Sequence, residues 1–142
     1  MRKLCIVISI LMILAVLASL SCAFSMDTNQ IVDGLNATTN VTEAINIADV
    51  ENKAILLIFD QDSCYYCDLL KSNVLTDKEV QNELNENYIV TIVEVNEYPQ
   101  LAGEFQIVGT PTIVVLDSNL TETARIGGYV EADEFLSALK EI

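Results

Sequence analysis

The sequence contains no histidine and only seven lysine or arginine residues, against 21 aspartate or glutamate residues, in 142 positions. Without histidine, a zinc site would need four cysteines and a c-type haem could not be attached through Cys-x-x-Cys-His. A formal net charge of -14 repels nucleic acid, and no basic tract opposes that repulsion. These absences exclude nucleic-acid binding, and we expect neither a metal nor a cofactor.

Cysteine is also scarce, and its placement is informative. Cys5 and Cys22 lie in the N-terminal segment, so Cys64 and Cys67 are the only thiols in the rest of the chain. They follow the apolar run 54–59 directly, at a predicted helix start, where unpaired N–H groups and the helix dipole favour a thiolate. A disulfide between them would close a very small loop and stabilise little. The pair therefore indicates a redox-active dithiol, with an inert structural disulfide as the alternative.

Residues 1–25 have the pattern of a targeting segment. Arg2 and Lys3 give a positive start, residues 4–20 are almost entirely apolar, and small residues surround Cys22. The apolar stretch is nearly long enough to span a bilayer, so a cleaved signal peptide and an uncleaved anchor both remain open. Lipid attachment at Cys22 is a further alternative. Each outcome predicts a domain outside the cytoplasm, secreted or anchored to the outer face of the cell membrane. We expect the polar residues 26–39 to form a tether.

Helical and strand patterns alternate over residues 40–142, which predicts one α/β domain. Asn40 with Glu43 three residues later is typical of a helix cap. The expected helices cover 40–52, 63–74, a segment around Val80 and Leu84, 99–105 and 132–142. The expected strands cover 54–59, 88–95, 112–116 and 122–126, the last two forming a hairpin. This order predicts a mixed β-sheet sandwiched between helices.

Four sequence pieces, taken in order, resemble the thioredoxin superfamily over residues 40–142. They are Cys64-Tyr65-Tyr66-Cys67, the segment 75–80, Val108-Gly109-Thr110-Pro111-Thr112, and Gly128-Tyr129-Val130 leading into Glu134-Phe135. The chain is similar to exported thioredoxin-like domains such as the C-terminal domain of DsbD. The resemblance implies that Cys64 attacks and Cys67 resolves. It also implies that Pro111 is a cis-proline facing them and that Thr110 offers its backbone to substrate.

The sequence departs from that family around the cysteines. The family's buried acid, six residues before the first cysteine, is replaced by Ile58, and Ser63 stands where tryptophan is usual. Asp60 either takes over the proton relay or is a solvated loop acid. Together with Asp62 and Asp68 it places negative charge near the cysteines, which disfavours a thiolate. This negative charge predicts that the dithiol acts more as a reductant than as an oxidant.

Tyr65 and Tyr66 have two interpretations. They either shape substrate contact, with one ring exposed and one packed, or serve as core anchors. We expect Tyr129 to pack in the core.

These patterns together predict an extracytoplasmic thiol–disulfide oxidoreductase, more a reductase than an oxidase. Its partners would be disulfide-containing protein substrates and a thiol protein that donates or accepts electrons. The competing hypothesis is a non-enzymatic thioredoxin-fold module that binds an extended peptide or delivers metal.

Overall fold

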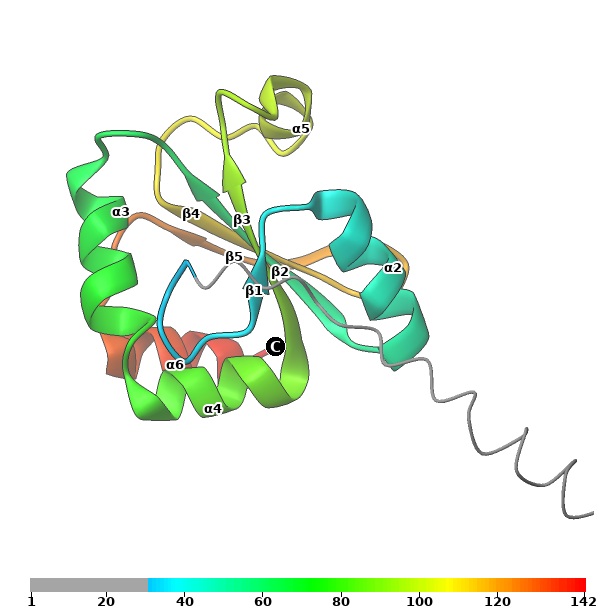
Figure 1. Ribbon diagram of the computed structural model, residues 1–142, viewed down its shortest axis with the longest axis horizontal. Coiled ribbons are helices and arrows are strands. Elements are labelled where there is room, and N and C mark those ends of the chain that lie inside the picture. The colour runs from blue at the N-terminus through cyan, green and yellow to red at the C-terminus, as the bar shows by residue number, and fades with distance from the viewer. Residues whose placement is uncertain (1–30) are drawn as a thin grey trace, which may run out of the picture.

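The computed structural model describes residues 31–142, which are built around a five-stranded mixed sheet (Figure 1). The strand order is β1-β3-β2-β4-β5. The strands are β1 (Ala37–Thr38), β2 (Ala54–Asp60), β3 (Tyr88–Glu94), β4 (Thr112–Leu116) and β5 (Glu122–Gly127). The first three run parallel, whereas β4 is antiparallel to β2 and forms the expected hairpin with β5.

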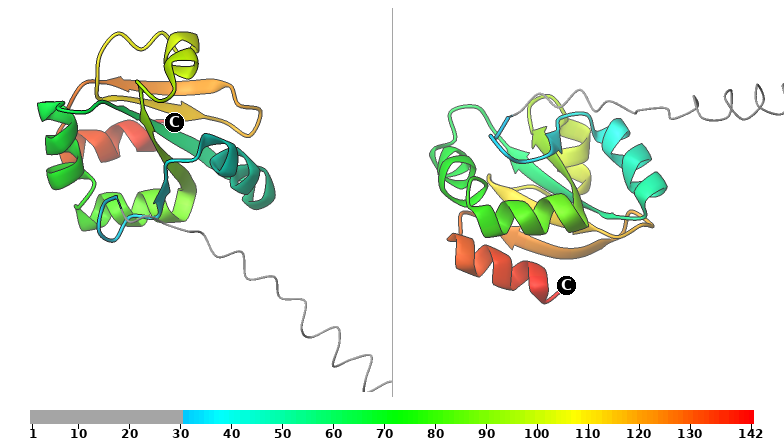
Figure 2. Two further views of the ribbon diagram at one scale, coloured as in Figure 1. Left: turned by 45° about the horizontal axis from the view of Figure 1, so that its top comes forward. Right: turned by 60° about the horizontal axis from the view of Figure 1, so that its bottom comes forward.

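Helices cover both faces of the sheet, as the two views in Figure 2 show. They are α2 (Val41–Glu51), α3 (Tyr65–Leu69), the π-helical turn η1 (Leu70–Val74), α4 (Lys78–Asn87), α5 (Pro99–Glu104) and α6 (Ala132–Lys140). One core layer joins the sheet to η1, α4 and α6, and the other joins it to α2 and α5. The predicted mixed sheet between helices is therefore confirmed.

Strand β2 is the central element of this core. Leu56 and Ile58 face the layer with η1, α4 and α6, while Ile55, Leu57 and Phe59 face the layer with α2 and α5. All five side chains are at most 2% exposed. An uninterrupted apolar run is what a strand covered on both faces requires, because successive side chains point to opposite faces.

Local hydrogen bonds set the helix boundaries. The Asn40 side chain accepts from the Glu43 N–H at 3.1 Å, as the sequence predicted, and Asp77 caps α4 in the same way. The helix expected over 63–74 begins only at Tyr65 and ends in the π turn, where the Leu75 N–H bonds to the Leu70 carbonyl. Sequence periodicity does not distinguish that wider turn from an α-helix.

The structure differs from the expected polar tether over 26–39. Within its described part, Val32 and Leu35 are buried, and β1 pairs with Val90 and Thr91 of β3. The Gln81 side chain donates to the carbonyls of Asp33 (2.6 Å) and Leu75 (2.9 Å), which ties this segment to α4. A strand of two residues has no detectable period, so β1 could not be predicted from the sequence pattern.

The predicted signal or anchor over 1–25 lies outside the described residues. Within residues 31–142, no helix combines the length and apolar character needed to cross a bilayer.

Candidate active site

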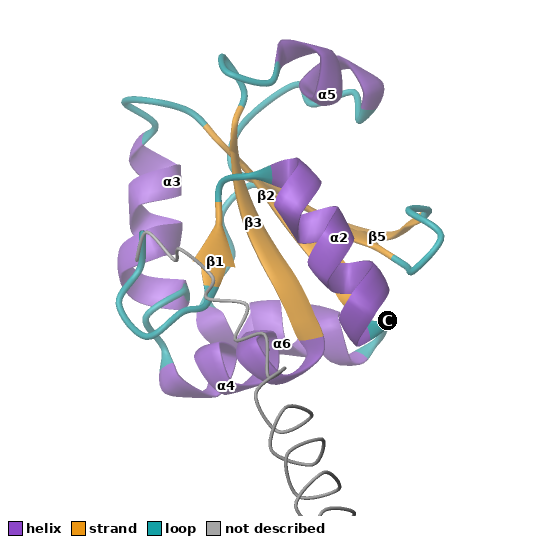
Figure 3. Cartoon of the chain, turned by 45° about the vertical axis from the view of Figure 1, so that its right-hand side comes forward, coloured by secondary structure: helices purple, strands orange, loops and turns teal. Residues whose placement is uncertain are grey.

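The loop after β2 leads into α3 (Figure 3), and the two cysteines lie at the start of this helix. Cys64 is the N-cap residue of α3, and its sulfur is bonded to that of Cys67. Cys67 is 2% exposed, whereas Cys64 is partly exposed. The sequence predicted this pair, and the structure makes the two cysteines unequal, since Cys64 is partly exposed and Cys67 is buried.

The Cys64 sulfur lies among hydrogen-bond donors. The Cys67 N–H donates to it at 3.2 Å, and the Thr110 hydroxyl donates to it at 3.3 Å. The Thr110 carbonyl oxygen is 3.5 Å away. Both donors aim at the atom that carries the charge in a reduced, ionised Cys64, and hydrogen bonds to an ion are stronger than those between neutral groups.

Thr110 and Pro111 reach the cysteines from the loop before β4. Their peptide bond is cis, and the Pro111 carbonyl accepts the Gly128 N–H at 2.8 Å. The Thr112 hydroxyl donates to the Gly109 carbonyl at 2.7 Å, fixing the other side of the loop. The structure thus brings Cys64 and Thr110, 46 positions apart in sequence, into contact.

Asp60 is not a solvated loop acid. It is the last residue of β2, its side chain is 14% exposed, and its carboxylate lies 2.9 Å from the Lys71 ammonium. Lys71 also lies 3.5 Å from Asp68. Burial lowers the pKa of Lys71, but the hydrogen bond and charge of Asp60, together with Asp68, raise it overall. The sequence pattern did not predict this ion pair, because no regular spacing in the sequence shows that the loop between β2 and α3 brings Asp60 and Lys71 together.

Ile58, by contrast, is buried in the apolar layer that includes Leu70 and Val74 of η1. This position therefore supplies no carboxylate to the cysteines.

Tyr65 and Tyr66 are both on the surface, at 69% and 57% exposed, so the core-anchor interpretation is wrong. Their rings meet edge to face at 5.4 Å, and the Tyr66 ring lies 6.4 Å from that of Tyr129. Tyr129 is partly buried and packs against the core, as expected. Its pKa is raised, first by desolvation and further by Glu131, which lies beside it.

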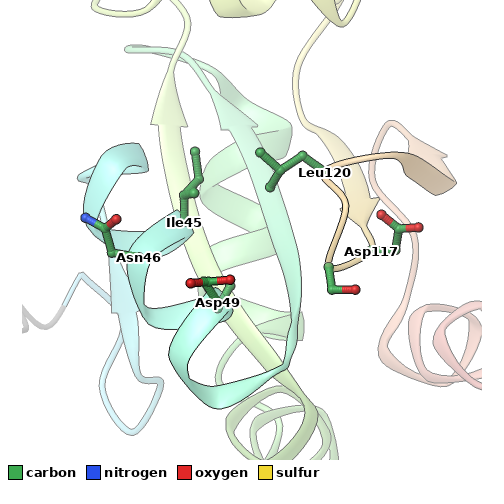
Figure 4. Close-up of a pocket in the computed structure, with 7 residues that line it drawn as sticks. Ile45, Asn46, Asp49, Asp117 and Leu120 are labelled. Carbon is green, nitrogen blue, oxygen red and sulfur yellow. The ribbon is translucent and has the colours of Figure 1, made fainter.

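A separate shallow pocket lies between α2 and the turn joining β4 to β5 (Figure 4). Ile45, Asp49, Asp117 and Leu120 are among its lining residues. It is at the far end of the sheet from the cysteines, because Leu116 pairs with Ile55 at the start of β2, whereas Thr112 pairs with Phe59 near its end. Within residues 31–142, no cluster of three or more metal-ligating side chains is present.

A mixed sheet between helices, with a Cys-x-x-Cys disulfide at a helix start facing a cis-proline loop, defines the thioredoxin-like class of proteins. The chain belongs to this family, because the family model for a thioredoxin-like domain matches residues 41–142.

Individual relatives agree with this assignment. The chain is 29% identical over 97 residues to the thiol:disulfide interchange protein DsbD of Actinobacillus pleuropneumoniae, a match covering 65% of the chain but only 17% of that protein. It is also 29% identical over 98 residues to bloodstream-specific protein 2 of Trypanosoma brucei brucei, covering 69% of the chain and 19% of that protein. The chain thus spans less than a fifth of these relatives.

Solved structures give the same fold. A thioredoxin from Thermus thermophilus superposes with a TM-score of 0.70 at 28% identity, covering 76% of this chain and 86% of that one. The reduced DsbD C-terminal domain of Neisseria meningitidis superposes with a TM-score of 0.62 at 24% identity, covering 73% of this chain and 97% of that one.

Proposed function

We propose that this protein is an extracytoplasmic thiol–disulfide oxidoreductase that works mainly as a reductase. The observation that carries the proposal is the unequal exposure of the two cysteine residues. Cys64 is partly exposed and hydrogen-bonded at the start of α3, whereas Cys67 is buried. An accessible thiolate can attack a partner, and a covered thiol three residues away can complete the exchange.

The proposed reaction has two steps. The Cys64 thiolate attacks one sulfur of a partner disulfide, the partner S–S bond breaks, and the other partner sulfur leaves as a thiolate. Cys67 then attacks the Cys64 sulfur, forming the Cys64–Cys67 disulfide and releasing the partner's second thiolate. Two electrons pass from the dithiol to the partner, and the protons lost by Cys64 and Cys67 balance those gained by the released thiols.

The reductase direction rests on local charge. Asp62 is exposed two residues before Cys64, and Asp68 is next to Cys67. Negative neighbours destabilise the thiolate, hence the reduced form, and lower the reduction potential of the couple. A thiol protein of the same compartment would return Cys64 and Cys67 to the reduced state. The extracytoplasmic location rests on the sequence pattern of residues 1–25 and on the likeness to DsbD.

Trapping tests the assigned roles. Cys67→Ala should accumulate mixed disulfides with protein substrates, because no thiol at position 67 remains to attack the Cys64 sulfur and release the partner. Cys64→Ala should trap few or none, since the remaining thiol is covered. The measurement is non-reducing electrophoresis of affinity-purified variants. Equal trapping by both variants would contradict the role of Cys64 as the attacking thiol.

Reduction of insulin disulfides tests the activity itself. The wild-type protein should accelerate it with dithiothreitol as electron donor, and Cys64→Ala should not. Equilibration with glutathione then gives the potential of the couple. Peptide binding without any catalysed reduction would instead favour the non-enzymatic module.

A further inference from the structure

Four aromatic or aliphatic side chains form what is here called the contact face: Tyr65, Tyr66, Val108 and Tyr129. The first three are exposed, and Tyr129, whose ring lies 6.4 Å from that of Tyr66, is partly exposed. Tyr65 and Tyr66 follow Cys64 directly, and Val108 stands two residues before Thr110, which contacts the Cys64 sulfur. Val108 is fully exposed at 101%, although it is aliphatic. Exposed apolar side chains around a reactive sulfur offer a partner chain a surface on which to pack.

The border of this contact face is acidic. Asp62 precedes Cys64 by two residues, Asp68 follows Cys67 and is 73% exposed, and Glu131 lies beside Tyr129. The cation nearest to the cysteines along the chain is Lys71 of η1, which is already paired with Asp60 and Asp68. The carboxylates of Asp60, Asp62, Asp68 and Glu131, set against the one ammonium group of Lys71, leave a local net charge of -3.

Two of the four other cations of the described chain are already paired with carboxylates. Near Val108, Arg125 is engaged by Glu122 at 2.7 Å, and Glu104 lines the same depression. Lys53 directly precedes β2 and so stands at its opposite end from the cysteines, and it pairs with Glu51. Residues 31–142 hold 5 basic and 20 acidic side chains, a net of -15. A field of one sign raises the encounter rate of oppositely charged partners and suppresses like-charged ones.

We propose that the disulfide reduced by this protein is carried on a basic segment of its partner, with lysine or arginine residues flanking the cystine. Apolar side chains next to that cystine pack on the contact face, while the flanking cations meet Asp62, Asp68 and Glu131. This proposal rests on the proposed function, since it names the class of substrate for the same dithiol.

Two synthetic peptides test the proposal, each closed by one disulfide and identical except for flanking lysine in one and flanking glutamate in the other. Single-turnover reduction by the pre-reduced full-length protein gives a rate for each. The rate with dithiothreitol, which is uncharged, corrects for intrinsic reactivity. At an ionic strength of about 0.01 M, where the Debye length is about 30 Å, the lysine peptide should react at least about tenfold faster. At about 1 M salt the two rates should converge.

Two matched double variants distinguish the effect of charge beside the cysteines from the effect of the overall charge of the protein. Asp62→Asn with Glu131→Gln should reduce the lysine preference several-fold. Asp49→Asn with Glu86→Gln removes the same charge from exposed positions on α2 and α4 and should leave the preference intact. Using the ratio of the two peptides cancels any change in thiolate reactivity. Equal corrected rates, or an equal effect of the two double variants, would overturn the proposal while leaving the oxidoreductase intact. Failure to reduce either peptide would overturn both.

Discussion

At the scale of single residues, the environment of the Cys64 sulfur combines a helix start with a distant loop. The Cys67 N–H comes with the N-cap position and follows from the Cys-x-x-Cys spacing. The Thr110 hydroxyl comes from the loop before β4 and adds a donor that the helix does not supply. Thr110 is therefore expected to act through its side chain, whereas the family resemblance implied only a backbone role.

Replacement of Thr110 by valine tests this side-chain role. Thr110→Val removes the hydroxyl at nearly constant volume, so the Cys64 thiolate loses one hydrogen bond. The midpoint of the thiolate absorbance on titration should rise by about 1 pH unit, corresponding to about 1.4 kcal/mol. Thr110→Ser, which keeps the hydroxyl, is the control and should restore the midpoint. An unchanged midpoint in the valine variant would show that the 3.3 Å contact does not reach the thiolate.

At the scale of elements, an ion pair connects the end of β2 to the helix that carries the cysteines. Asp60 closes β2, and Lys71 lies in η1, just after α3. The pair is partly covered, with the two side chains 14% and 28% exposed, so its effect should lie between that of a surface pair and that of a buried one. Lys71 also neutralises the charge of Asp60, so that this carboxylate adds little to the negative potential at the cysteines.

Lys71→Met should therefore destabilise the domain by about 1 kcal/mol at neutral pH. The pKa of Lys71 is raised in the folded state, so its contribution is complete below the unfolded pKa of about 10.4. That contribution is lost as the pH rises through the folded pKa. Urea unfolding of both proteins should give a constant difference from neutral pH to about pH 10, and a smaller one above it. A difference that grows at high pH would contradict the assigned sign.

At the scale of the whole molecule, the domain includes the segment before Asn40. Val32 and Leu35 fill the layer above η1 and α4, and β1 covers the edge of β3. Gly34 has φ +82, and a Cβ there would lie 2.7 Å from the Gln81 side chain, so the turn depends on glycine. The segment is a structural part of the thioredoxin-like domain.

Truncation measures this contribution. A chain beginning at residue 31 should unfold cooperatively, whereas one beginning at residue 40 should be less stable by about 4 kcal/mol, because burying each of Val32 and Leu35 contributes about 2 kcal/mol. The measurement is urea unfolding followed by circular dichroism, with each free energy obtained from that chain's own m-value, which should be smaller for the shorter chain because it exposes less surface on unfolding. Equal stability of the two chains would show that residues 31–39 only rest on the surface.

The sequence alone determined the elements whose signal is local. The apolar run of β2, the Asn40 cap and the Cys-x-x-Cys spacing depend on neighbours within a few positions, and each was found in place. The tertiary structure decided what depends on distant parts of the chain: the ion pair of Asp60 with Lys71, the contact of Thr110 with Cys64, and β1 on β3. Such contacts leave no periodic pattern or fixed spacing in the sequence, because they form only when the folded sheet brings distant segments together.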